Sequence, residues 1–489
     1  MKKPNFNFRA VLTALAAIAF IFTVTACKST STGKSSNTIT LTIGASENLA
    51  PMIKNFDAVN QKATWTSSAP SVVSVNESGT VTALRFTDSS KGTGQAEITA
   101  AAETGGKKEI FTVITTMEAQ VDMMTLPPLK DQFAKYFLIG NIFHNGNRRF
   151  DIDSDISGGV VSNERLTRHF NVLTAENEMK PSYLSGAAPG QYNQNNIATA
   201  KRMVDAAIAS GFKVVGHTLL WHSQIPQWQA SLRTDNTTEA DALKYMRGYV
   251  TDIMTEFKGK IYSWDVLNEV FPDGGYTPDS NWRDVMRKDA SGNPWYMKIG
   301  ADFVYEGYLA ARKADPNAIL YYNDYNLDQS AKARMVRNMV NEVNERYKKE
   351  VGGTRLLIEG IAMQSHHNTG VMTARISNTL NLFRPLGVKI SISELDILSQ
   401  TWSQYRSNPE RDTSLDSTAT YHGRLEAANL YGQYFKLFLE NADIIERVSF
   451  WGVYDAQSWR AKGLPLLFDG IDVSKAKPGY YSVVNSLLQ

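Results

Sequence analysis

The stretch KISISELDIL (residues 389–398) has the composition of a buried β-strand, yet it carries two acids. Isoleucine and leucine occupy half of its positions, and Glu394 and Asp396 stand among them. An ionised carboxylate inside a buried strand is costly unless another group pairs with it. The stretch therefore predicts a core strand whose end holds acids for a purpose other than packing.

Seven further short apolar runs accompany this one along the chain. They cover residues 136–141, 169–176, 213–221, 262–269, 319–326, 358–366 and 447–455. Amphipathic stretches of helical period separate them, for example residues 197–211, 301–316 and 331–349. Eight strand–helix units over this length predict a (β/α)8 TIM barrel. An open doubly wound sheet is the structural alternative, but no glycine-rich nucleotide motif follows the first runs.

Nearly every run ends in polar or aromatic residues that a buried strand does not need. These residues are Glu176, Asn177, His217, Trp221, His222, Asn268, Glu269, Asn323, Asp324, Tyr325, Asn326, Gln364, His366, His367, Glu394, Asp396, Trp451, Asp455 and Trp459. In a parallel barrel the carboxyl ends of all strands meet at one face, where substrates bind. The pattern predicts one active site at that face.

Two of these acids, Glu269 and Glu394, lie on the fourth and the seventh runs. A pair of carboxylic acids at one barrel face suits glycoside hydrolysis, in which one protonates the leaving oxygen and the other attacks the anomeric carbon. The alternative is that each is a buried acid satisfied by a neighbour. Tryptophan faces can stack on sugar rings, and the amides, histidines and lysine can bind hydroxyl groups. No H-E-x-x-H motif is present, so we expect no catalytic metal and no cofactor.

The ordered motifs identify a family resemblance over roughly residues 130–489. LTAENEMKP, GHTLLWHSQIPQW, WDVLNE, LYYNDYNL, GIAMQSHHN, ISELDI, FWGVYDAQSW and LPLLFD resemble glycoside hydrolase family 10, the retaining endo-β-1,4-xylanases. The resemblance implies that Glu269 is the general acid/base and Glu394 the nucleophile. It also implies that xylan and xylo-oligosaccharides are the substrates.

Other site residues follow from the same resemblance, motif by motif. Asn268 matches the residue that holds the 2-hydroxyl of the sugar being cleaved, and His366 matches one that orients the nucleophile. Tyr325 matches a stacking position on the leaving-group side. The remaining substrate-binding matches are Glu176, Asn177, Lys180, His217, Trp221, Gln224, Gln364, Trp451, Trp459 and Arg460. Asp265 and Asp396 match no direct catalytic role and are expected to orient their neighbours.

The chain departs from the family pattern at several places. Ser393 stands where threonine usually precedes the nucleophile, and Val215 stands where arginine often precedes the Gly-His pair. Both could change the packing beneath the site. A long polar stretch, residues 399–423, follows the seventh run, and we expect an irregular loop there beside the barrel mouth.

The first residues resemble a bacterial lipoprotein signal. Lys2, Lys3 and Arg9 precede an apolar run that ends at VTAC, where Cys27 is the only cysteine of the chain. We expect residues 1–26 to be a lipoprotein signal peptide and Cys27 to be lipidated. Residues 27–37 then form a polar tether, and the protein is held on the bacterial cell envelope. The alternative is a plain signal peptide or membrane anchor with an incidental cysteine.

Residues 38–117 have an all-β texture of alternating apolar and polar positions, with turn signals at NESG and ETGG. Their order of strands resembles the bacterial Ig-like group-2 domain, with Trp65 as a core residue. We expect a small sandwich that serves as a spacer, followed by a linker over residues 118–130 and the barrel over residues 131–489.

The charge balance of 51 basic against 49 acidic residues leaves a net charge of +2 in a chain of 489 residues, which does not indicate a nucleic-acid partner. Two other functions remain open from the residues. One is a retaining activity on β-1,4-glucan or on mixed substrates. The other is a surface glycan-binding protein that has lost catalysis, although the presence of both acids argues against it.

Overall fold

The computed structural model describes residues 37–42, 45–56, 62–84, 93–116, 122–146, 154–288, 291–407, 418–469 and 475–488. The predicted signal peptide, Cys27 and all of the predicted tether except Asn37 lie outside these residues. Two compact units divide the chain between Ala119 and Gln120. No helix in the described part of the chain is long and apolar enough to cross a membrane.

The first unit is a β-sandwich of two small sheets. Its strands are β1 (Thr38–Thr42), β2 (Ser46–Asn48), β3 (Ala63–Ser67), β4 (Val73–Val75), β5 (Thr80–Ala83), β6 (Thr93–Ala102) and β7 (Lys108–Thr116). One sheet has the order β1-β7-β6-β3 and the other β2-β5-β4. Alternate residues of β6 and β7 are buried, as a strand with one covered face requires. Trp65 is partly buried, and its ring packs against that of Phe111 in the core, 6.4 Å between centroids.

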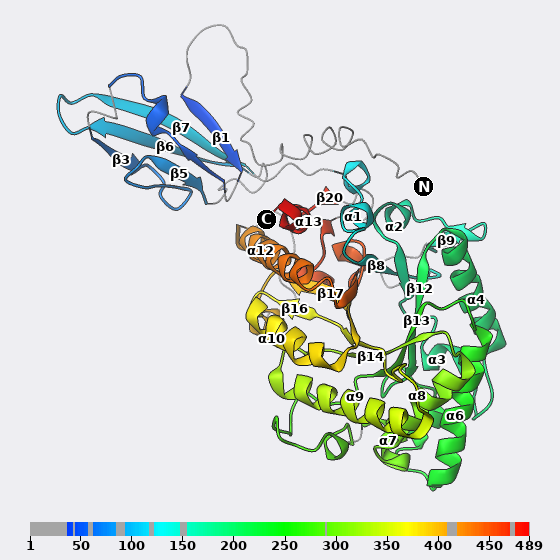
Figure 1. Ribbon diagram of the computed structural model, residues 1–489. Coiled ribbons are helices and arrows are strands. Elements are labelled where there is room, and N and C mark those ends of the chain that lie inside the picture. Colours follow the sequence, from blue (N-terminus) through cyan, green and yellow to red (C-terminus); the bar gives the residue numbers. More distant parts are fainter. Residues whose placement is uncertain are drawn as a thin grey trace, which may run out of the picture. The chain divides into compact units, whose positions relative to one another are not determined.

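The second unit is a closed barrel of eight parallel strands, which confirms the predicted (β/α)8 architecture (Figure 1). The barrel strands are β8 (Leu138–Phe143), β11 (Val172–Ala175), β12 (Lys213–Leu220), β13 (Ser263–Asn268), β14 (Ile319–Asp324), β15 (Gly360–Met363), β17 (Lys389–Leu398) and β18 (Ile445–Phe450). Each pairs in parallel with the next, β18 pairs with β8, and β15 pairs with β17. A short strand, β16 (His366–Asn368), pairs in parallel with the last three residues of β17.

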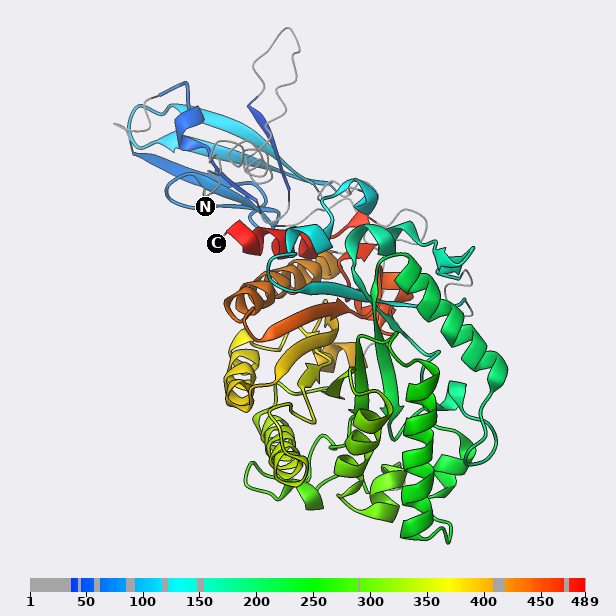
Figure 2. The ribbon, with the colours of Figure 1, turned by 45° about the vertical axis from the view of Figure 1, so that its right-hand side comes forward.

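Helices surround the barrel, as Figure 2 shows from a second direction. The longer ones are α4 (Gln194–Ala209), α6 (Glu239–Glu256), α8 (Phe303–Ala314), α9 (Ser330–Val351), α10 (Thr373–Phe383) and α12 (Thr418–Glu440). The shorter ones are α1 (Leu129–Gln132), α2 (Glu164–His169), α3 (Pro181–Leu184), α5 (Gln227–Ser231), α7 (Pro294–Ile299), α11 (Trp402–Ser407) and α13 (Pro478–Asn485). The side chains that α4, α6 and α9 bury recur at helical spacing, so each covers the strands with one apolar face.

The barrel unit begins earlier than the sequence predicted. Met123, Leu126 and Leu129 fall in residues 118–130, which were expected to form a linker, but all three are buried in the barrel's hydrophobic core. The paired prolines that suggested a linker instead lie immediately before α1. The reason is that burial of these apolar side chains outweighs the local turn signal.

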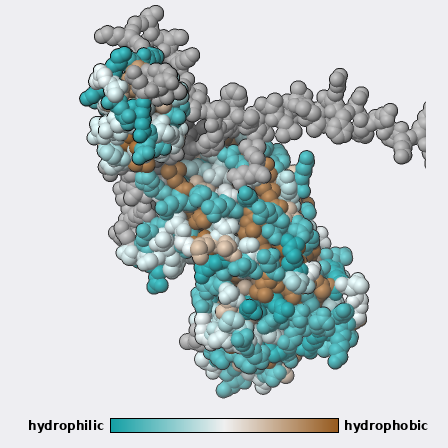
Figure 3. Space-filling view, turned by 60° about the vertical axis from the view of Figure 1, so that its left-hand side comes forward, coloured by the Kyte–Doolittle hydropathy of each residue, from teal (hydrophilic) through white to brown (hydrophobic). Residues whose placement is uncertain are grey.

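The face of the molecule drawn in Figure 3 carries hydrophobic side chains dispersed among hydrophilic ones. Dispersed apolar residues are normal on a protein surface and indicate no interface by themselves. The features that position chemistry lie instead at the carboxyl ends of the barrel strands.

Candidate active site

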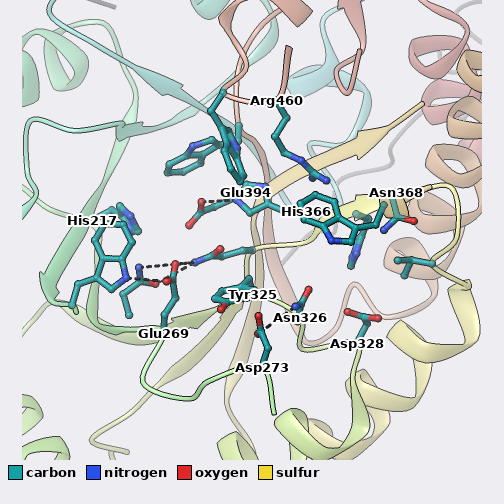
Figure 4. Close-up of a pocket in the computed structure, with 18 of the residues that line it drawn as sticks. His217, Glu269, Asp273, Tyr325, Asn326, Asp328, His366, Asn368, Glu394 and Arg460 are labelled. Atoms are coloured by element: carbon teal, nitrogen blue, oxygen red, sulfur yellow. Dashed lines mark hydrogen bonds and ion pairs between the residues drawn. The ribbon is translucent and has the colours of Figure 1, made fainter. Parts of the chain in front are cut away.

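A pocket of about 790 Å³ opens at the carboxyl ends of the barrel strands. Both predicted catalytic acids line it, and so does every side chain predicted to bind substrate: Glu176, Asn177, Lys180, His217, Trp221, Gln224, Asn268, Tyr325, Gln364, His366, Trp451, Trp459 and Arg460. Residues from seven of the eight strand ends therefore meet in one cavity. Figure 4 shows Glu269 and Glu394 near its centre.

Glu394 lies within β17 and is 5% exposed. His366 Nε2 lies 3.1 Å from its Oε2, and Asn323 Nδ2 donates to its Oε1 at 2.9 Å. Burial alone would raise the pKa of Glu394. The hydrogen bond from His366, the electrostatic effect of His217 and the bond from Asn323 outweigh burial, so the pKa of Glu394 is lowered. This carboxylate is ionised at neutral pH.

His366 lies between two carboxylates, Glu394 and Asp396. Its Nδ1 is 2.9 Å from Asp396 Oδ2, while Nε2 faces Glu394. Burial lowers the pKa of His366, but the charge of Asp396 and the two hydrogen bonds raise it to about 9. The imidazole is thus protonated at neutral pH, and both ring N–H groups donate. Asp396 in turn accepts from Arg460, a buried side chain.

Glu269 follows β13 directly and adopts a positive φ of 56°. This left-handed turn at the strand end directs its side chain into the pocket, where Trp221 Nε1 donates to Oε2 at 3.0 Å. Gln364 Nε2 donates to the other oxygen at 2.8 Å. His222 Nδ1 lies 4.0 Å from Oε2, and burial lowers the pKa of His222 to about 4, so a neutral imidazole is beside this acid.

A chain of amide side chains connects the two acids. Gln364 Nε2, which donates to Glu269, is also 3.3 Å from Asn268 Oδ1. The same Asn268 oxygen accepts from Asn323 Nδ2 at 3.0 Å, and Asn323 reaches Glu394. Because each amide has one partner on either side, the two acids are fixed relative to one another without a direct contact.

Ser393, one of the departures from the family pattern, belongs to this network. Its hydroxyl donates to Asn323 Oδ1 at 2.7 Å and so fixes which end of the amide faces Glu394. A threonine at this position would carry the same hydroxyl. The substitution therefore leaves the hydrogen-bonding group in place.

His217 forms a second histidine–aspartate pair beneath the pocket. Its Nδ1 lies 3.0 Å from Asp265 Oδ2, and both side chains are buried. Arg447 Nη2, from β18, lies 3.8 Å from the other Asp265 oxygen, and Arg447 Nη1 donates to Ser263 at 2.6 Å. Ser263 is the register partner of Val215, the second departure. A buried cation thus stands near Asp265 although position 215 is apolar.

One end of the pocket is a polar cluster on the loops after β11 and β12. Lys180 Nζ donates to Asn177 Oδ1 at 3.1 Å and to Gln224 Oε1 at 2.8 Å, and it lies 5.3 Å from the ring of Trp221. Burial lowers the pKa of Lys180, while the surrounding acids, Glu394 first, act in the opposite direction. These groups present several donors and acceptors beside an aromatic face.

The other end contains Tyr325, which two cations hold. Arg287 donates to its hydroxyl and, through Nε at 2.9 Å, to the backbone oxygen of Glu269. Lys332 Nζ lies 3.7 Å from the ring centroid of Tyr325 and 2.8 Å from Asp324 Oδ1. Tyr325 is therefore fixed in place relative to Glu269.

In the described part of the chain, no group of three or more His, Cys, Asp or Glu side chains is arranged to hold a metal ion. His217 and His366 are each bonded to an aspartate, and His366 also to Glu394. The chemistry that the residues support directly is acid–base and nucleophilic chemistry by two carboxylic acids.

Comparison with known proteins agrees with this geometry. The family model described as "Glycosyl hydrolase family 10" matches residues 128–486. The chain belongs to this family. The model of the bacterial Ig-like domain (group 2) matches residues 30–113, the sandwich unit.

Two curated relatives of this family 10 chain are large proteins. "Endo-1,4-beta-xylanase A" of Thermotoga neapolitana is 33% identical over 379 residues, which are 76% of this chain and 32% of the relative. "Exoglucanase XynX" of Acetivibrio thermocellus is 31% identical over 371 residues, which are 74% of this chain and 29% of the relative. The chain thus spans about a third of the length of these relatives.

A solved structure resembles the chain over almost its whole length. It is a bacterial Ig-like domain containing GH10 xylanase from termite gut, with 50% sequence identity and a TM-score of 0.71. The likeness covers 92% of this chain and 98% of that one. The sandwich and the family 10 barrel therefore also occur together in another protein.

Sequence reasoning missed several residues of the family 10 site. Asn323 was noted only as a polar strand end, although it joins the two acids, and Arg287, Lys332 and Arg447 were not singled out. Asn323 could have been found from its place before Asp324 at the end of the fifth run. Arg287 and Arg447 carried no local signal because their partners are distant in sequence. Lys332 lies close to its partners Asp324 and Tyr325 in sequence, but no motif marked it.

Proposed function

We propose that the barrel unit hydrolyses internal β-1,4-xylosidic bonds of xylan and xylo-oligosaccharides with retention of configuration. The observation that carries the proposal is the pair Glu269 and Glu394, joined by one amide network, with Glu394 held ionised by His366. Support also comes from the relatives named as xylanases.

Substrate binding follows from the two ends of the pocket. In this proposal, one polar cluster binds the hydroxyl groups of the sugar that precedes the reacting sugar, on the side away from the leaving group. Its residues are Glu176, Asn177, Lys180 and Gln224. Trp221, Trp451 and Trp459 stack on the C–H faces of the rings. Tyr325 stacks on the leaving-group side. Asn268 and Gln364, which contact one another, lie beside Glu269 where the 2-hydroxyl of the reacting sugar would be placed.

In the first step the carboxylate of Glu394 attacks the anomeric carbon and forms a covalent glycosyl ester. The bond from that carbon to the leaving oxygen breaks, and Glu269 gives its proton to this oxygen. His366 and Asn323 keep Glu394 in a single orientation before attack. This preorganisation lowers the entropic cost of reaching the transition state.

In the second step Glu269, now ionised, takes a proton from water. The resulting hydroxide attacks the anomeric carbon from the opposite face and the ester bond to Glu394 breaks. Two inversions give net retention, and Glu269 ends protonated and Glu394 ionised, as they began. The step needs no metal or redox cofactor.

Product analysis on xylan and on a soluble cellulose derivative tests the substrate class. We expect short β-xylo-oligosaccharides from internal cleavage, and β-anomers first in the proton NMR spectrum. The relative named exoglucanase supports β-1,4-glucan as a second candidate substrate. Faster release of sugar from the glucan than from xylan would favour that activity instead.

The remaining alternative is a glycan-binding protein without catalysis. It would bind xylan in affinity electrophoresis and release no reducing sugar. Wild-type protein that releases no product from either polysaccharide, while still binding one of them, would overturn the proposed hydrolysis.

We also propose that the protein is exported and anchored to the bacterial envelope through a lipid on Cys27. The support is the basic, then apolar, then VTAC order of the first residues. Wild-type protein expressed in a bacterium is expected in the membrane fraction, with a mass increase at its N-terminus. The Cys27→Ala variant is expected to leave the membrane fraction and to lack the mass increase. If the variant stays in the membrane fraction with an uncleaved leader, a plain membrane anchor is favoured.

A further inference from the structure

Two exposed tryptophans occur among the described residues, and both line the same pocket. Trp459 is 61% exposed and Trp402 is 47% exposed. A half-exposed tryptophan forgoes much of the free energy that its burial would contribute, so large exposed aromatics in a cavity point to a ligand. Trp459 belongs to the site already described. Trp402, on α11 after β17, has no role in it.

Two side chains, Tyr405 and Arg460, contact the ring of Trp402. Its ring stacks on that of Tyr405, with 5.7 Å between centroids and 23° between planes. The guanidinium of Arg460 lies 5.5 Å from the ring of Trp402 and 5.7 Å from that of Trp459. Arg460 is itself buried and bonded to Asp396. The two tryptophans thus share one rigid support, which is connected through Asp396 and His366 to Glu394.

Polar groups line the pocket near Trp402: the backbone N–H of Thr369, next to Asn368, donates to the backbone oxygen of Gln400, two residues before Trp402, at 3.4 Å. Asn368 and Arg375 line the same cavity, and Arg375 pairs with Asp328 at 3.2 Å while its side chain remains 47% exposed. In Figure 4, Asn368 and Asp328 lie on the opposite side of Glu269 and Glu394 from His217. An aromatic face with amide and guanidinium donors beside it has the same chemistry as the opposite end, which is built around Trp221 and Lys180.

We propose that Trp402, with Asn368 and Arg375, forms a distal sugar-binding subsite on the leaving-group side of the cleaved bond. The proposal rests on the proposed function, because the Tyr325 end is the leaving-group side only if the barrel acts as described. Its ligand is a xylose unit beyond the one that directly follows the cleaved bond. The subsite makes long chains better substrates than short ones.

The test compares two substrates that differ in what lies on the leaving-group side. Xylohexaose can reach the subsite, whereas 4-nitrophenyl β-xylobioside has only a nitrophenyl group there. For Trp402→Ala we expect the ratio of kcat/KM on xylohexaose to kcat/KM on the aryl xylobioside to fall about five- to twentyfold relative to wild type. Trp402→Phe is expected to restore most of the ratio, because it keeps an aromatic face.

Met372 gives the matched control. It is 65% exposed and follows Val371, a pocket residue, but does not itself line the pocket. Met372→Ala should leave the ratio unchanged. An unchanged ratio in Trp402→Ala, or an equal loss on both substrates, would overturn the subsite. Thermal unfolding of each variant shows whether an equal loss in Trp402→Ala comes from misfolding. If Trp402→Ala is misfolded, the same ratio of kcat/KM values is measured in Trp402→Phe and decides the question.

Failure of the proposed function is a different result. If wild-type protein cleaves neither substrate, the hydrolase proposal fails before the variants are compared. If wild type cleaves both and only the ratio is unaffected by Trp402→Ala, the hydrolase proposal stands and the subsite does not.

Discussion

Glu394 and Glu269 are held in different ways although both line the same pocket at the barrel mouth. Glu394 lies inside the hydrogen-bonded part of β17, is almost fully buried, and contacts a protonated histidine. Glu269 is one residue past β13, in a left-handed turn, and its side chain is 13% exposed. Its partners, Trp221 and Gln364, are neutral.

The difference corresponds to the two roles proposed for them. A group that attacks carbon benefits from being ionised and immobile, and a cation fixed by Asp396 provides both properties. A group that gives and takes a proton must be accessible in both charge states, and neutral donors favour the carboxylate less strongly than a cation does. Identical side chains thus acquire different chemistry from their neighbours.

The largest expected effect is that of Glu394→Ala. Removing the attacking carboxylate should lower kcat on every substrate by about 10⁴-fold or more, because no other group is placed to form the ester. Reducing-sugar release and nitrophenol release both measure it. Azide added to the variant is expected to give an α-glycosyl azide. Full activity in Glu394→Ala would refute the assignment of the nucleophile.

Glu269→Ala should show a loss that depends on the leaving group. Hydrolysis of xylan is expected to fall by about 10²–10⁴-fold, because the leaving oxygen there needs a proton. The first step on an activated aryl xylobioside needs little protonation and should be much less affected. Stopped-flow release of nitrophenol compares the two. Equal losses on both substrates would contradict a role as general acid.

His366→Gln tests whether the protonated His366 causes the difference between Glu394 and Glu269. The hydrogen bond to a charged partner is worth about 1.5–3 kcal/mol, so kcat/KM is expected to fall about ten- to a hundredfold. Without the imidazolium, burial raises the pKa of Glu394, and the acid limb of the pH profile should move to higher pH. His422→Gln, at an exposed position, is the control and should leave the profile unchanged.

The same histidine predicts a pH dependence of stability in the wild type. Because folding raises the pKa of His366 from its ordinary value of 6.5 to about 9, its stabilisation is complete below pH 6.5. It is lost as the pH rises through about 9. Urea unfolding between pH 6 and 10 is expected to show this decline, and the decline should be smaller in His366→Gln.

The smallest effect is expected at Ser393. Ser393→Ala removes the bond to Asn323 and should cost about 1 kcal/mol of stability and a few-fold in kcat, because Asn323 can then turn away from Glu394. Ser393→Thr keeps the hydroxyl and should remain close to wild type. Ser391→Ala is the matched control, since the Ser391 hydroxyl is buried without a hydrogen-bond partner among the described residues. A larger effect of Ser391→Ala than of Ser393→Ala would contradict this reading.

Much of the fold could be predicted from local pattern. Each of the eight apolar runs overlaps a barrel strand, and polar residues at or after the ends of seven of them line the pocket. The linker prediction was wrong over residues 122–130, where Met123, Leu126 and Leu129 pack into the core. A pair of prolines is a local signal, whereas burial against a distant part of the chain is not.

Sequence by itself determined the strand order, the two acids and the aromatic residues around them. These features can be predicted because strand periodicity and the residues at strand ends depend only on short stretches of sequence. Tertiary structure decided the hydrogen bonds of each acid, and of these partners only His366 was expected beside the nucleophile, from the family resemblance. Asn323 and His366 reach Glu394 across 71 and 28 residues, and Arg460 reaches Asp396 across 64. Charge states depend on such distant contacts and on burial, so only the closed barrel distinguishes the ionised Glu394 from Glu269 with its neutral partners.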